Sequence, residues 1–116
     1  MNKDLKKGIL LKINDTLDTL QLRLTLNKET IILQEQVDPT LKEAVEFYQN
    51  IALQNEQAKK VIKECEETIE KLQLLKNHFA DLSLDAIVNL YHNYEAFTMA
   101  TFQQKLMNTL QLTHRL

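Results

Sequence analysis

Hydrophobic residues recur every three or four positions along most of this chain, which is the spacing of a heptad seam on an α-helix. The pattern is interrupted before Pro39 and around Ser83, so it divides the chain into three segments. We expect an all-α protein of three long helices, over about residues 4–37, 39–79 and 84–114, packed as an elongated coiled coil or helical bundle. The whole chain, residues 1–116, is expected to form one domain.

The first two segments carry the clearest seams. In the first, Asn27 fills a skipped seam position, and a second apolar set on a neighbouring face indicates two helical neighbours. The first seam comprises Leu10, Ile13, Leu17, Leu20, Leu24 and Ile31, and the second set comprises Leu22, Leu26, Leu33 and Val37. In the second segment the a and d positions run unbroken through Leu41, Ala44, Tyr48, Ile51, Asn55, Ala58, Ile62, Cys65, Ile69, Leu72, Lys76 and Phe79.

Asn55 has two interpretations. A buried Asn at an a position of a coiled coil lowers stability but disfavours wrong registers and wrong oligomers. Asn55 therefore either specifies the register of a partner or is a seam residue in contact with solvent.

The third segment has few charges and two adjacent apolar faces. One face carries Ile87, Leu90, Tyr94, Phe97 and Thr101, and the other carries Val88, Tyr91, Phe102, Leu106 and Leu110. A helix with such a broad apolar surface lies between two other helices or faces another chain.

Capping residues mark the segment boundaries. Asp38 precedes Pro39, and proline is favoured at the first position of a helix because its missing N–H would have no intrahelical partner there. Ser83 is placed to cap the third segment, with Asp85 near the positive end of the helix dipole.

Composition narrows the functional classes. Fourteen Lys and Arg against sixteen Asp and Glu give a net charge of −2, which disfavours nucleic acid as a partner. Cys65 is the only cysteine, so an internal disulfide and a zinc cluster are excluded, and its seam position predicts a core role. His78, His92 and His114 are isolated. A chain with so few loops is expected to be neither an enzyme nor a cofactor-binding protein.

The apolar run near the N-terminus does not indicate a targeting or membrane segment. Residues 9–11 are apolar, but Lys12 interrupts them at once, and the run is too short for a signal peptide or a membrane span. We therefore expect an intracellular protein without membrane insertion.

The order of these features resembles the coiled-coil region of a central-channel nucleoporin, the smallest member of the three-chain subcomplex that anchors Phe-Gly repeats in the nuclear pore. The resemblance covers nearly the whole chain. Its landmarks are Leu22-Arg23, Leu33-Gln34 before Pro39, Phe47-Tyr48, Glu66-Glu67, Asp81-Leu82-Ser83, Leu90-Tyr91 and Phe97.

The resemblance implies a non-enzymatic scaffold at the nuclear pore, whose seams contact other helical chains in a hetero-oligomer. We expect the isolated chain to form a homo-oligomer. The expected partner-interface residues are Tyr48, Asn55, Ile62, Ile69, Leu72, Tyr91, Tyr94, Phe97, Phe102 and Leu106. The chain contains no Phe-Gly dipeptide, so only the assembly role of the family is expected here.

An alternative is a small bacterial or phage helical adaptor or chaperone that binds a partner helix. Tyr91 and Glu95 match the loose Tyr-x-x-x-Glu pattern that resembles the export signal of type VII secretion substrates. A DNA-binding regulator is a third class, but the final helix has only two formally cationic residues, Lys105 and Arg115.

Overall fold

The described part of the chain is all-helical, as the sequence predicts. A computed structural model describes the backbone of residues 2–35 and 45–115 and the side chains of residues 3–31 and 50–110. Within these ranges the elements are α1 (Asn2–Glu35), α2 (Val45–Asn77), the short 3-10 helix η2 (Phe79–Asp81), α3 (Leu84–Asn93) and α4 (Met99–Arg115). The predicted boundary at Asp38 and Pro39 lies outside the described residues.

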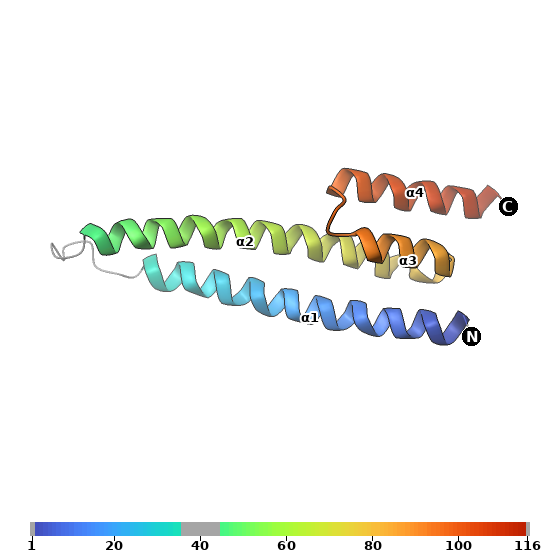
Figure 1. Cartoon of the computed structure of the whole chain (residues 1–116), viewed down its shortest axis with the longest axis horizontal. Coiled ribbons are helices and arrows are strands. Elements are labelled where there is room, and N and C mark those ends of the chain that lie inside the picture. Colours follow the sequence, from blue (N-terminus) through green and yellow to red (C-terminus); the bar gives the residue numbers. More distant parts are fainter. Residues whose placement is uncertain (1, 36–44, 116) are drawn as a thin grey trace.

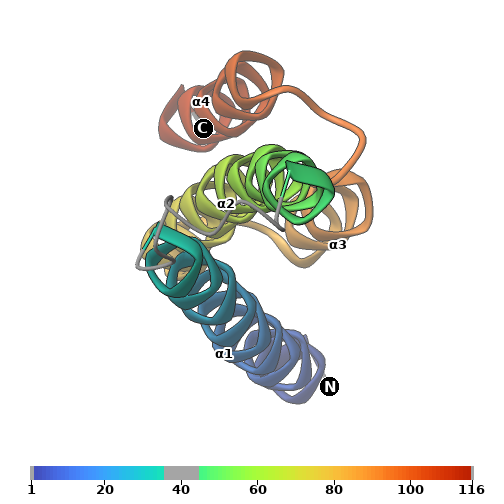
Figure 2. The same cartoon turned by 90° about the vertical axis from the view of Figure 1, so that its left-hand side faces the viewer.

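Two long helices form an antiparallel hairpin, and two shorter helices cover one end of it (Figure 1). α3 turns back along the C-terminal part of α2, and α4 turns again to run in the same direction as α2. Viewed end-on, α2 and α3 lie between α1 and α4 (Figure 2). The molecule is elongated, with extents of 69 × 26 × 17 Å.

The boundary predicted at Ser83 is confirmed. The backbone of Ser83 is extended, with φ −69° and ψ 159°, and its Oγ accepts a hydrogen bond from the Ala86 N–H at 3.2 Å. This bond satisfies one of the N–H groups that the first turn of α3 leaves without a helical acceptor. Asp85 lies in the same turn, near the positive end of the dipole.

The prediction of a single third helix is wrong, because residues 84–114 form two helices within the described chain. After α3, the Asn93 carbonyl accepts from the N–H groups of Ala96 at 3.0 Å and Phe97 at 3.1 Å. The chain then turns at Thr98, whose Oγ1 accepts from the Thr101 N–H at 3.1 Å and so caps α4. No Gly or Pro marks this bend, so residue type alone did not reveal it.

The bend also explains the two apolar faces of the third segment. Ile87 and Leu90 are the buried residues of α3, whereas Phe102, Leu106 and Leu110 are buried among the described side chains of α4. The faces therefore belong to two helices that both turn toward the core, and no single helix carries a broad apolar surface.

The core lies at the end of the hairpin where all four helices meet. We call residues 2–20 and 68–115 the head and residues 21–35 and 45–67 the arm. The buried core cluster lies entirely in the head and comprises Ile13, Leu17, Ile69, Leu72, Leu75, Phe79, Leu82, Ile87, Leu90, Phe102, Leu106 and Leu110. Of the described helices, α1 and α2 alone form the arm and pack against each other there (Figure 1).

Candidate partner-binding surface

The seam of the arm is only partly closed. Among the described side chains of the arm, the buried hydrophobic ones are the small residues Ala58 and Cys65, which are 5% and 2% exposed. The large seam side chains remain half-buried; they are Leu24, Ile31, Ile51 and Ile62. In the head the same seam is buried at Ile13, Leu17 and Leu72, whereas Leu10 and Leu20 are half-buried there too. Two helices alone therefore cannot remove the apolar stripe of the arm from water.

Large apolar side chains are also exposed on the outer faces of the arm. Leu22 is 61% exposed and Leu26 is 53% exposed, and they lie one helical turn apart on α1. Leu53 on α2 is 59% exposed. The sequence predicted a second helical neighbour for α1 at Leu22 and Leu26, and the described chain supplies none there.

Asn55 lies half-buried in the arm seam. Its Oδ1 is shielded from solvent and has no hydrogen-bond partner among the described residues. An unpaired buried carbonyl oxygen costs free energy that a donor from another chain would recover. Lys28 and Glu66 link the two arm helices at 3.6 Å, but both side chains are about half exposed, so this ion pair contributes little.

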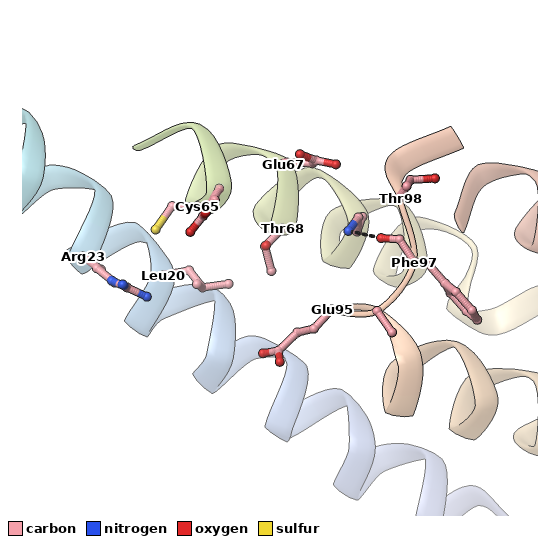
Figure 3. A pocket seen from close by; sticks show the side chains of 11 residues that line it. Leu20, Arg23, Cys65, Glu67, Thr68, Glu95, Phe97 and Thr98 are labelled. Carbon is pink, nitrogen blue, oxygen red and sulfur yellow. Dashed lines mark hydrogen bonds between the residues drawn. The ribbon is translucent and has the colours of Figure 1, made fainter. Parts of the chain in front are cut away.

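A pocket of about 480 Å³ lies where the arm meets the head (Figure 3). Its lining comes from α1, α2 and the bend between α3 and α4. The lining residues are Leu20, Arg23, Glu64, Cys65, Glu67, Thr68, Lys71, Glu95, Ala96, Phe97 and Thr98. Figure 3 shows Arg23 and Glu95 on different sides of the pocket, with Cys65 and Thr68 along its α2 wall. Carboxylates outnumber cations in the lining, so the pocket favours a positively charged group over an anion.

Lys71 closes the head side of this pocket. The side chain is only 4% exposed, and its Nζ donates hydrogen bonds to the backbone carbonyls of Tyr94 at 3.0 Å and Phe97 at 2.5 Å. A buried ammonium is tolerated when hydrogen bonds compensate for lost hydration. The bond to Phe97 is the dashed line in Figure 3. Lys71 thus ties α2 to the bend between α3 and α4.

Tyr94 lies beside this bend. Its pKa is raised from 10.0 to about 12, first because burial disfavours the phenolate and then because the Glu95 carboxylate lies close. The Tyr94 hydroxyl donates to Glu95 Oε1 at 3.3 Å, and its ring stacks on Tyr91 with centroids 5.6 Å apart. The phenol is therefore neutral at physiological pH and acts as a donor. Among the described residues, no group of three or more His, Cys, Asp and Glu side chains could hold a metal ion.

The structure places the predicted interface residues in three different environments. Ile69, Leu72, Phe102 and Leu106 are buried in the core of the head, where other helices of the same chain cover them. Half-buried positions against that core are taken by Tyr91, Tyr94 and Phe97. The half-buried arm seam contains Asn55 and Ile62. The side chain of Tyr48, in the first turn of α2, lies outside the described residues.

Sequence reasoning missed Lys71 and Thr98. Lys71 lies outside the predicted heptad seam, in a stretch of α2 that is rich in Lys and Glu. Thr98 is the cap of α4, and a Thr followed three residues later by another Thr is a weak signal for a helix start. Only the three-dimensional path of the chain shows that the two residues meet at one bend.

The fold and this surface define an all-α protein with a closed helical head and an open helical-hairpin arm. Comparison with known proteins found no matching family, no matching curated sequence and no matching solved structure. Within the described residues, no helix is both long enough and apolar enough to cross a membrane.

Proposed function

We propose that this protein is a non-enzymatic helical assembly subunit, whose arm forms a hetero-oligomeric coiled coil with a helix of another protein. The observation that carries the proposal is the contrast along one seam. In the head the centre of the seam is buried at Ile13, Leu17 and Leu72, while Leu10 and Leu20 are half-buried. In the arm the large seam residues Leu24, Ile31 and Ile62 are all half-buried. A third helix along the arm would cover these apolar side chains, as α3 and α4 cover the core residues of the head.

The chemistry of the arm describes the partner. Its half-buried leucines and isoleucines favour an amphipathic helix with an apolar stripe. The unpartnered Oδ1 of Asn55 favours a donor such as Asn, Gln or Lys at one seam position of that helix. The carboxylate-rich pocket at the inner end of the arm favours a Lys or Arg near one end of the same helix.

Two biological settings fit such a subunit. In the first, the chain is a scaffold segment of the nuclear-pore channel and all three segments contact other chains. In the second, it is a bacterial or phage adaptor or chaperone that folds by itself and binds one partner helix, for example in type VII secretion. The self-contained head favours the adaptor, because Leu72, Phe102 and Leu106 are already covered by their own chain.

The proposal is tested with a variant that changes the arm without disturbing the core. Leu22→Gln with Leu26→Gln replaces two exposed side chains by good helix formers, so the fold should persist. We expect wild type to recover a stoichiometric partner from its native lysate and the double variant to lose it. The identified partner must then bind in purified form, as measured by calorimetry.

A matched control lies on the head. Val88→Gln with Met107→Gln changes two large apolar side chains that are each 48% exposed, so it also removes exposed apolar surface, but away from the arm. This control should bind the purified partner like wild type. Equal binding by wild type and the arm variant would refute an interface on the outer face of α1. Equal binding by Leu24→Gln, which changes a half-buried seam side chain, would refute an interface along the seam.

A further inference from the structure

The first residues of the bend between α3 and α4 continue the helical path of α3 before the chain reverses direction at Thr98 (Figure 1). Tyr94 has helical dihedrals, with φ −58° and ψ −33°, and the Phe97 N–H bonds to the Asn93 carbonyl in the pattern of an α-helix. No described non-glycine residue has positive φ, and no Gly or Pro occurs between residues 84 and 115. Nothing in the residue types prevents this segment from being straight, which is why a single helix was predicted.

The bend is held by groups that replace lost helical hydrogen bonds. In a straight helix the carbonyls of Tyr94 and Phe97 would accept from the N–H groups four residues later, at Thr98 and Thr101. In the bent chain both carbonyls accept from Lys71 Nζ instead, and the Thr101 N–H donates to Thr98 Oγ1. The Lys105 ammonium also lies 5.1 Å from the Phe97 ring centroid. Lys71 is thus the main polar contact that favours the bend over the straight helix.

Straightening would remove α4 from its position on α2 and α3. Phe102, Leu106 and Leu110 are buried there, at 0%, 2% and 7% exposed, so a straight monomer would expose them together with the surface they cover. A second copy of the chain offers an identical surface, so two straight copies can exchange their α4 helices, with each α4 packing on α2 and α3 of the other copy. Exchange of an identical element is a low-cost route to a dimer.

We propose that the α3–α4 bend is a latch held by Lys71, and that opening this latch joins residues 84–115 into one helix whose α4 part packs on a second copy of the chain. The occupant of the vacated surface is α4 itself, because that surface is already shaped around Phe102 and Leu106. This inference does not depend on the proposed function of the arm.

The test uses one variant that destabilises the bend and a second that prevents the continuous helix. Lys71→Met keeps a long side chain but leaves the Tyr94 and Phe97 carbonyls without their donor. The straight helix therefore becomes more stable relative to the bent chain. By light scattering across a concentration series, we expect its dimer dissociation constant to be at least about tenfold lower than that of wild type. Lys63→Met, at an exposed position on the same helix, is the matched control and should behave like wild type.

Met99→Pro should restore the monomer in the Lys71→Met background. Position 99 is the first residue of α4, where proline is tolerated in the bend. In a continuous helix the same proline would remove a hydrogen bond and clash with the preceding turn. A dimer that persists in the double variant would overturn the proposal, because its formation would not require a straight segment.

Spin-label distances distinguish exchange from other dimers. Labels are attached to Asp85→Cys and Asn108→Cys in a Cys65→Ala background, with one labelled chain diluted among unlabelled copies. The bent chain holds the two sites on neighbouring antiparallel helices, whereas a straight helix separates them by about 35 Å at about 1.5 Å per residue. We expect the long distance in the Lys71→Met dimer and the short one in the monomer. A dimer with only the short distance would contradict the exchange.

A milder variant covers the case in which Lys71→Met does not fold. Thr98→Ala removes the exposed cap of α4 and favours the straight helix, so it should shift the same equilibrium in the same direction. Thr25→Ala, at an exposed position on α1, is its control. The latch would be refuted if Thr98→Ala had the same dimer dissociation constant as wild type and Lys71→Met remained a monomer. These dimer measurements do not involve the arm, so they are unaffected by whether Leu22→Gln with Leu26→Gln loses its partner.

Discussion

The side chain of Phe102 is expected to be a main support of α4. Phe102 is 0% exposed in the head, so Phe102→Ala removes a fully buried ring and leaves a cavity between α4 and the helices beneath it. Deletion of a buried phenyl ring costs about 3–5 kcal/mol, which combines the transfer of the ring and the residual cavity. Met107→Ala on the same helix is the control, because Met107 is 48% exposed and should cost no more than about 1 kcal/mol.

This loss is large relative to the whole protein. At about 0.05–0.15 kcal/mol per residue, a chain of 116 residues has an unfolding free energy of roughly 6–17 kcal/mol. Urea denaturation followed by circular dichroism measures the difference between the two variants directly. Similar free energies of unfolding for Phe102→Ala and Met107→Ala would refute the packing of α4 on α2 and α3.

Three further predictions concern individual polar groups. Ser83→Ala should lower the unfolding free energy by about 1 kcal/mol in urea denaturation, because it removes the cap of α3, whereas the exposed Thr25→Ala should not. The pKa of Tyr94 is raised from 10.0 to about 12, so its contribution to stability is complete below pH 10 and is lost as pH rises toward 12. A difference ultraviolet titration of wild type against Tyr94→Phe would show ionisation near pH 10 if this were wrong. Lys28→Ala should change the free energy of unfolding by less than about 0.5 kcal/mol, because its ion pair with Glu66 is half exposed to solvent. A larger loss would mean that this ion pair is shielded from solvent.

The sequence predicted the inward faces of α1 and α2 in part, since Lys76, a predicted seam position, is exposed. Ile13 and Leu17 are buried on α1, and Cys65, Ile69 and Leu72 are buried on α2, all at predicted seam positions. Heptad periodicity succeeds here because it reports which side of a helix meets a neighbour. The start of α3 after Ser83 was also predicted, since capping chemistry is local.

The bend and the second inward face of α2 could not be predicted in the same way. Leu75 is fully buried because α3 and α4 fold back onto α2, and that depends on the turn at residues 94–98. The turn is stabilised by Lys71, which is more than twenty residues away in the chain. Periodicity carries no information about such a distant contact. Four residues expected at an interface with other chains, Ile69, Leu72, Phe102 and Leu106, therefore lie in the core of the chain itself.

Native-state hydrogen exchange along α2 tests the division into head and arm most directly. One helix crosses both regions, so its two halves are compared under the same conditions and with similar intrinsic helix propensity. We predict that amides of residues 50–60 exchange at least about 100-fold faster than amides of residues 69–77, because the arm lacks the buried core that protects the head. Uniform protection along α2 would contradict an open arm and, with it, the proposal that another protein's helix binds there.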